Sequence, residues 1–215
     1  MIGVCGGNSA KIQSEVGAPS KRGFSTLGRM NEAHEICGSD EWRQLMREQI
    51  LPWVLNGNDL GDDVLEVGPG YGAVTDVLST ALPQVTCVEI DEKLAAMLTE
   101  RFSGVPSVRI LRGDATALDF PDGRFSGAAC FTMLHHVPTA ELQDRLLAEV
   151  ARVLRPGATL VASDSIASVD LENAHEGDTY NPVDPTGLAK RLTAAGFVDV
   201  DVRTNDLGWA ATARR

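Results

Sequence analysis

The residues best suited to hold a ligand lie in three short segments, each directly after a predicted strand. The first, Glu66-Val67-Gly68-Pro69-Gly70-Tyr71-Gly72, leads from a strand into a helix. Its glycines let backbone approach a ligand closely, and the helix N-terminus offers unpaired N–H groups. Glu89 ends the second strand and is suited to accept hydrogen bonds from both hydroxyls of a ribose. Asp114 and Ala115 follow the third strand, where the carboxylate suits an adenine amino group. These segments predict a nucleoside-containing cofactor.

The elements that position these segments alternate regularly between strands and helices. Alternation of this kind predicts a parallel sheet covered by helices on both faces, with the carboxyl ends of its strands at one edge. The last two strands are joined only by Asn205–Gly208, too short for a parallel crossover, and must pair as an antiparallel hairpin. We therefore predict an α/β, Rossmann-like, doubly wound fold with a seven-stranded, mostly parallel sheet. The predicted strands cover residues 64–67, 85–89, 108–111, 127–131, 159–162, 198–203 and 209–213.

Predicted helices cover the intervals between these strands. They span residues 74–82, 94–102, 139–154 and 188–195. Ser39 is placed to cap a further helix on the N-terminal side, whose apolar pattern is disturbed at Pro52.

The glycine loop alone does not separate two classes of cofactor. Gly68-x-Gly70-x-x-Ala73 also satisfies the relaxed fingerprint of NAD-binding proteins. Glu66, however, places a carboxylate beside the loop, which suits the cationic part of S-adenosylmethionine (SAM) and repels a pyrophosphate. The C-terminal hairpin is also foreign to the usual dinucleotide sheet. These features favour SAM, with an NAD-dependent oxidoreductase as an alternative.

Four motifs, in their order and spacing, resemble class I SAM-dependent methyltransferases. They are Val64–Gly72, Val88–Asp91, Gly113–Ala115, and Leu134–Val137 followed by Arg152–Gly157. The last of these resembles the small-molecule branch that includes quinone-biosynthesis C-methyltransferases. The resemblance covers roughly residues 40–215 and implies transfer of a methyl group from SAM to an O, N or C atom of a small molecule.

The resemblance also implies contacts for individual residues. Gly68 and Gly70 would face the methionine moiety, Ile90 would pack on the adenine, and the backbone of Cys130 would lie near the SAM amino group. The predicted cofactor-binding residues are Glu66, Gly68, Gly70, Gly72, Glu89, Ile90, Asp114, Ala115 and Cys130.

The first half of the chain also resembles the rRNA adenine dimethyltransferases. Those enzymes carry an Asn-x-Pro-aromatic motif after the fourth strand, where this chain reads Cys130-Phe131-Thr132-Met133-Leu134. A net charge of −11 also repels a phosphate backbone. We therefore expect no nucleic-acid partner. Adenine methylation of RNA and a SAM-binding protein without catalysis are kept as alternatives.

Histidines at the rim of the predicted site have two interpretations. His135, beside His136, is a candidate general base, because an imidazole pKa near 6.5 suits proton transfer. A packing role is the favoured interpretation. His34 is predicted to be exposed, with a place in a lid as the alternative. No metal ligands are assigned, because neither the four scattered cysteines nor the segment 163–185 shows ligand-like spacing.

The segment 163–185 is rich in acidic residues. It contains His175 but no Lys or Arg, and its carboxylates are Asp164, Asp170, Glu172, Glu176, Asp178 and Asp184. A solvated loop is the favoured interpretation, over a cap that binds a cationic substrate or a divalent metal.

The chain is predicted to consist of a mobile tail over residues 1–28 and a methyltransferase domain over 29–215. Within the domain, residues 163–185 are positioned to serve as a substrate cap. The sequence has no apolar run of about 18 residues, and we expect neither a membrane span nor a secretory leader. We therefore expect a cytoplasmic protein with a small-molecule partner and no membrane partner. Its oligomeric state stays open.

Overall fold

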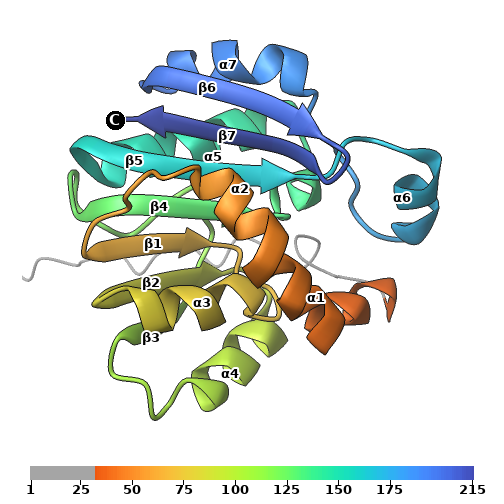
Figure 1. Cartoon of the computed structure of the whole chain (residues 1–215), viewed down its shortest axis with the longest axis horizontal. Coiled ribbons are helices and arrows are strands. Elements are labelled where there is room, and N and C mark those ends of the chain that lie inside the picture. Colours follow the sequence, from red (N-terminus) through yellow and green to blue (C-terminus); the bar gives the residue numbers. More distant parts are fainter. Residues whose placement is uncertain (1–31) are drawn as a thin grey trace, which may run out of the picture.

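A seven-stranded sheet forms the centre of the molecule. The computed structural model describes residues 32–215, so the predicted tail over residues 1–28 lies outside them. The strand order is β3-β2-β1-β4-β5-β7-β6 (Figure 1). Strands β1 to β5 pair in parallel, and β7 runs antiparallel to both β5 and β6. The predicted mostly parallel sheet with a C-terminal hairpin is confirmed. The strands are β1 (Asp63–Val67), β2 (Gln84–Glu89), β3 (Val108–Arg112), β4 (Phe125–Phe131), β5 (Leu154–Asp164), β6 (Val198–Asn205) and β7 (Gly208–Arg214).

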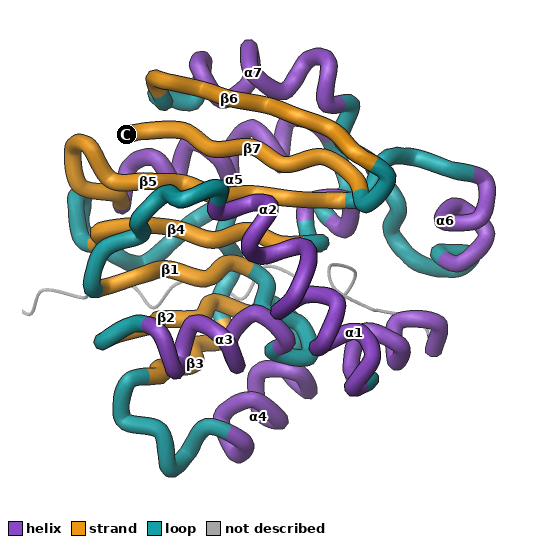
Figure 2. Tube along the Cα trace, viewed as in Figure 1, coloured by secondary structure: helices purple, strands orange, loops and turns teal. Residues whose placement is uncertain are grey.

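Helices cover the sheet on both faces. Figure 2 shows α2 and α3 crossing in front of the strands and α5 passing behind them. Each predicted helix between strands is present, with boundaries within a few residues. These helices are α3 (Ala73–Ala81), α4 (Glu92–Arg101), α5 (Ala140–Val153) and α7 (Pro185–Ala194).

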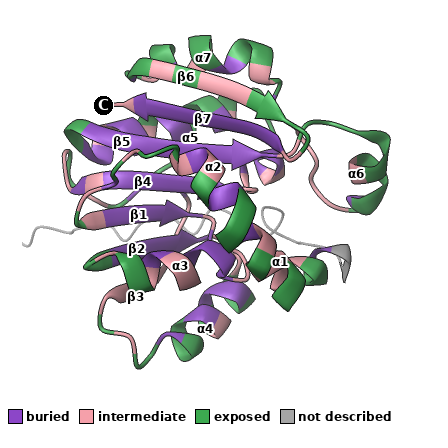
Figure 3. Cartoon of the chain, viewed as in Figure 1, coloured by how far each residue is buried: buried purple, intermediate pink, exposed green. Residues whose placement is uncertain are grey.

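Two hydrophobic cores result, one on each face. Leu146 of α5 and Leu188 of α7 belong to one core, and Met46 and Val74 belong to the other. Neighbouring strand residues alternate between the cores because successive side chains of a strand point to opposite faces. This explains why the central strands read as continuous apolar runs rather than as an alternating pattern. Figure 3 shows the inner strands buried and the edge strand β6 largely exposed.

The N-terminal helical segment is longer than predicted. Ser39 caps α1 (Asp40–Leu45) as predicted, since its Oγ accepts a hydrogen bond from Trp42 N at 3.1 Å. A π-helical turn, η2 (Met46–Ile50), then leads into α2 (Leu51–Leu55). Pro52 disturbs the helix without ending it, because it lies in the first turn of α2, where a proline is tolerated.

Strand β5 begins earlier than predicted. Arg155-Pro156-Gly157 follows the end of helix α5 as expected, yet these residues already belong to the strand. Leu154 pairs with Phe125 of β4, across a register shift that separates this pair from the regular ladder. Proline is tolerated at such an irregular strand start.

The acidic segment contains a short helix in place of the predicted loop. Helix α6 (Val169–Ala174) begins after Ser168, whose Oγ accepts from Leu171 N at 3.2 Å. Figure 1 shows α6 projecting beyond the ends of β5 and β7. Two 3-10 turns complete this region, η1 (Glu32–Gly38) and η3 (Leu134–His136). Among residues 32–215, no helix is long and apolar enough to cross a membrane.

Candidate cofactor and acceptor site

Two cavities meet at the carboxyl ends of the parallel strands. The first is lined by predicted cofactor-binding residues that include Glu89, Ile90, Asp114 and Ala115. The second lies between η1, α1, the glycine loop and α6. Both cavities are lined by Gly68, Gly70, Thr132 and His136, so the two spaces adjoin at the turn between β1 and α3.

The glycines of the loop differ in whether they border the two cavities. Gly70 has a φ of 55°, and a Cβ built on it would meet no atom within 4 Å, so this residue faces open space. Gly72 has a φ of 78° and begins α3, but a Cβ there would approach the Leu98 side chain to 2.7 Å. Gly72 lines neither of these cavities, so its absent side chain allows packing against α4 rather than ligand approach.

Glu89 links the end of β2 to the glycine loop. Its Oε2 accepts from Gly70 N at 3.0 Å, and its Oε1 accepts from Asp91 N at 2.9 Å. The residue is only 5% exposed, and its pKa is raised because burial outweighs the backbone hydrogen bonds that it accepts. Since a carboxylate has about four acceptor sites, two amides leave capacity for ribose hydroxyls.

The loop after β3 forms the far end of the first cavity. Asp114 Oδ1 accepts from Thr116 N at 2.8 Å, which fixes the carboxylate in a turn. Ile90, at the end of β2, and Ala115 line the same cavity and supply apolar surface. The structure thus brings the adenine-type and ribose-type residues of the sequence prediction into one space.

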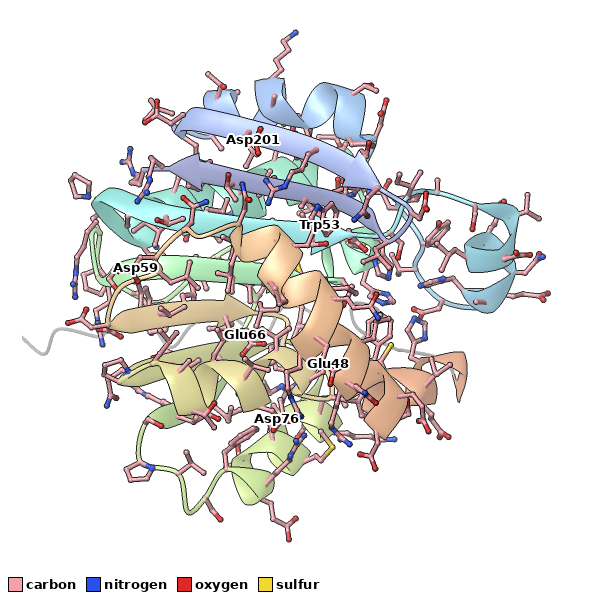
Figure 4. All side chains as sticks on the ribbon, viewed as in Figure 1. Glu48, Trp53, Asp59, Glu66, Asp76 and Asp201 are labelled. Atoms are coloured by element: carbon pink, nitrogen blue, oxygen red, sulfur yellow. The ribbon has the colours of Figure 1, made fainter. Side chains whose placement is uncertain are left out.

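Glu66 lies inside the sheet, on β1, and lines the second cavity. Figure 4 labels it among the central strands. Its Oε2 accepts from Thr75 Oγ1 at 2.7 Å and from Cys87 Sγ at 3.4 Å. Burial raises the pKa of Glu66 to about 7, against the opposing effect of these two hydrogen bonds. The carboxyl group is therefore poised to ionise near neutral pH.

The end of β4 differs in detail from the sequence prediction. Cys130 is buried within the strand, where burial raises its pKa to about 12, and it lines neither cavity. Thr132 and Met133, which sequence reasoning missed, line the first cavity instead. Thr132 has a φ of 48° and donates its N–H to Ser163 O at 2.8 Å. Its position directly after a parallel strand was the signal that could have identified it.

The histidines are more buried than predicted. His34 was expected to be exposed, and this is wrong, because its residue is only 7% exposed. His34 Nε2 lies 3.1 Å from Nε2 of His175, which was placed in a solvated loop and is also buried. The cause is tertiary, since η1 and the end of α6 pack together although they lie 141 residues apart in the chain.

His135 is held by a buried carboxylate. Its backbone N–H donates to Asp164 Oδ2 at 3.0 Å, and its Nδ1 lies 2.7 Å from Asp164 Oδ1. Neighbouring His136 lines both cavities, and burial together with the nearby His135, His34 and His175 lowers its pKa to about 2. His136 is therefore neutral at physiological pH.

The acidic segment divides into buried and exposed carboxylates. Asp164 and Asp178 are almost completely buried and lie beside histidines, so a fully solvated loop is wrong for them. Asp184 caps α7, accepting from Thr186 N at 2.9 Å. The exposed residues of the segment, Asp170, Glu172, Glu176 and Asp184, agree with the predicted solvation.

Comparison with known proteins shows that part of the chain is similar to methyltransferases. Residues 65–162 match the family model of a methyltransferase domain. A ribosomal RNA small subunit methyltransferase A from Synechococcus sp. (strain WH7803) is 36% identical over 117 residues, 52% of this chain and 41% of the relative. The corresponding protein of Dehalococcoides mccartyi (strain CBDB1) is 43% identical over 72 residues, 33% of this chain and 25% of the relative. The chain thus matches less than half the length of these relatives.

Solved structures share the fold at low sequence identity. PH0226 from Pyrococcus horikoshii OT3 has a TM-score of 0.73 and 17% identity, covering 86% of this chain and 99% of that one. A SAM-dependent methyltransferase from Aquifex aeolicus has a TM-score of 0.64 and 20% identity, covering 86% and 97%. The [4+2]-cyclase SpnF has a TM-score of 0.61 at 20% identity, covering 78% and 80%.

The matched residues 65–162 contain both the glycine loop and the carboxylates at the ends of β2 and β3. Residues 65–162 therefore resemble a methyltransferase domain, and the chain shares the fold of a SAM-dependent methyltransferase of known structure.

Proposed function

We propose that this chain transfers the methyl group of SAM to a small-molecule acceptor. The observation that carries the proposal is the pair of cavities that adjoin at Gly68, Gly70, Thr132 and His136. One cavity presents residues suited to a nucleoside, and the other is a separate space beside the glycine loop. A donor and an acceptor lying in these two spaces would meet at the shared wall.

The residues of the first cavity fit the parts of SAM. Glu89 would hold the ribose, Asp114 the adenine amino group, and Ile90 with Ala115 the faces of the adenine. Gly68 and Gly70 would allow the methionine portion to approach the backbone. Burial disfavours the ionised form of Glu66, which lines the adjoining second cavity, and a SAM cation nearby would favour that form. Bound SAM supplies an activated methyl group and the leaving group for its transfer.

The second cavity fits an acceptor with an apolar body. Its walls include Trp42, Met46, Phe131 and Leu171, and residues of the segment 163–185 close one side. We propose that this segment serves as the substrate cap. Holding donor and acceptor in line can lower a barrier by roughly 7–11 kcal/mol, so transfer to a nucleophile that need not lose a proton requires no conspicuous catalytic pair.

We propose His135 as the candidate general base. Asp164 occupies its Nδ1 side, which leaves Nε2 to accept a proton from an acceptor hydroxyl or amine. The residue also lines the second cavity.

A second candidate acceptor is an adenine base of RNA. It is favoured by the likeness to the ribosomal RNA small subunit methyltransferases A, although the matched part is at most about half of this chain. Against it stand the net charge of −11 and the sequence Phe131-Thr132-Met133 at the end of β4, which contains no Asn or Pro.

The experiment that separates these candidates is a transfer assay with methyl-labelled SAM. The purified chain would be incubated with panels of small hydroxyl, amine and carbon acceptors and, in parallel, with ribosomal small-subunit RNA. Label in a small product supports the proposal, whereas label in RNA alone overturns it. SAM binding without transfer to either panel would identify a SAM-binding protein that does not transfer methyl groups. This outcome is tested because one fold can host several functions, and a [4+2]-cyclase shares this fold.

A further inference from the structure

All four histidines of the chain gather in one place, at the wall of the second cavity. The sequence contains only His34, His135, His136 and His175. Each offers one imidazole nitrogen, and the four nitrogens lie within 4.8 Å of one another. They come from three separate segments, namely η1, η3 and the residue after α6.

From this geometry we propose that His34, His135, His136 and His175 bind one transition-metal dication, with zinc as the reference ion. Neutral imidazole is a ligand suited to zinc, copper, iron and nickel, and four nitrogen donors match a four-coordinate site. The proposal concerns metal binding and stands independently of methyl transfer.

The spacing of the nitrogens is close to that of a tetrahedral site. Zinc–nitrogen bonds of 2.0–2.1 Å place two ligand nitrogens about 3.3 Å apart. His34 Nε2 and His175 Nε2 are 3.1 Å apart. All four nitrogens lie within 4.8 Å of one another, so no pair needs more than about 1.5 Å of closure, a change within reach of small side-chain rotations.

Hydrogen bonds from neighbouring groups orient these histidines as they do in known metal sites. A ligating histidine usually donates its other ring N–H to a carboxylate or a backbone carbonyl. His135 Nδ1 lies 2.7 Å from Asp164 Oδ1, and His175 Nδ1 lies 2.6 Å from Leu171 O. These contacts leave the Nε2 atoms of both histidines available to a metal.

The local charge also favours a cation. Asp164 and Asp178 have side chains that are 1% and 4% exposed, and both lie beside this cluster. Asp178 Oδ2 is 3.6 Å from His34 Nδ1 and 4.0 Å from His136 Nδ1. Carboxylates this close to the imidazoles favour a dication at the cluster by direct electrostatic attraction.

A bound ion would have a structural consequence. It would join η1 and the segment after α6 to η3, and so fasten two outer segments over the second cavity. His135 Nε2 cannot hold a metal and accept a proton at the same time, so metal binding excludes the general-base role of His135.

The test is titration of the full chain, stripped with a chelator, with Zn²⁺ in competition with a chromophoric zinc chelator. We expect one Zn²⁺ per chain and a higher unfolding temperature with the ion. His34→Gln and His175→Gln should each weaken zinc binding by more than about 100-fold, because losing an outer partner alone typically weakens it by about 10–100-fold. Asp164→Asn removes such an outer partner of His135 and should weaken zinc binding by about 10–100-fold.

The control is Tyr180→Phe, since the Tyr180 ring stacks on His175 with centroids 4.5 Å apart. Zinc affinity should be unchanged in this variant, and circular dichroism and SAM titration would check that every variant is folded. Cobalt(II) absorption of the unmodified chain tests the site without any mutation, because four-coordinate cobalt absorbs visible light strongly.

Three results would overturn the proposal: no binding of zinc or cobalt by the unmodified chain, a six-coordinate cobalt spectrum, or full zinc affinity in a folded His34→Gln/His175→Gln double variant. Since these titrations use the metal alone, they can fail while methyl transfer is intact.

Discussion

Replacing Glu66 by Gln removes the buried carboxyl group whose pKa lies near neutrality. The folded-state pKa of about 7 exceeds the ordinary value of 4.5 because burial disfavours the charged form. Between these two values the folded chain holds more protons than the unfolded chain, so stability falls as pH rises. The favourable contribution is fully present below pH 4.5 and is lost as pH rises through 7.

The size of the effect follows from the shift. One pKa unit corresponds to about 1.36 kcal/mol, and integration from pH 5 to pH 8 gives a loss of about 2.5 kcal/mol. Gln keeps the volume of Glu66 and stays neutral, so Glu66→Gln should lack this loss. We expect its unfolding free energy, relative to the unmodified chain, to rise by about 2.5 kcal/mol between pH 5 and pH 8.

Urea unfolding at several pH values between 5 and 8, without ligand, would measure this difference. Glu100→Gln is the matched control, because Glu100 is exposed on α4 and its removal tests the effect of losing one charge alone. A difference between Glu66→Gln and the unmodified chain that stays flat from pH 5 to pH 8 would refute the reasoning.

Glu66 also couples protons to cofactor binding in this account. A SAM cation near Glu66 favours the carboxylate, so binding at pH 6 should release about 0.9 proton. Calorimetry in two buffers of different ionisation enthalpy measures the release, and Glu66→Gln should abolish it. Equal proton release by the variant would remove Glu66 from the vicinity of the SAM cation.

Three further substitutions test the assigned residues. Glu89→Ala should weaken SAM binding by about 1–3 kcal/mol, because the ribose hydroxyls and the Gly70 amide lose their acceptor. If calorimetry gives the variant the same SAM affinity as the unmodified chain, Glu89 is not part of the site. Asp114→Ala should also weaken SAM binding, and a calorimetric affinity matching the unmodified chain would contradict its adenine contact. His135→Ala should leave SAM affinity unchanged, and unchanged turnover in a transfer assay would exclude it as the general base.

Much of the fold was predictable because it depends on local patterns. The alternation of apolar strands and amphipathic helices predicted the parallel sheet, and the short Asn205–Gly208 connection predicted a hairpin. The placement of Glu89 and Asp114 in one cavity was predictable because strand ends in a parallel sheet converge at one edge.

The histidine cluster was not predictable from spacing. His34 and His175 lie 141 residues apart, and nothing local indicates that η1 packs against the end of α6. The roles of Gly72 and Thr132 likewise depend on tertiary packing, since Gly72 faces α4 and Thr132 turns at the end of β4.

The most direct test of the account is parallel calorimetric titration of the full chain with SAM, S-adenosylhomocysteine and NADH. The account predicts micromolar binding of SAM and S-adenosylhomocysteine and no heat from NADH. Binding of NADH with no response to SAM would contradict it.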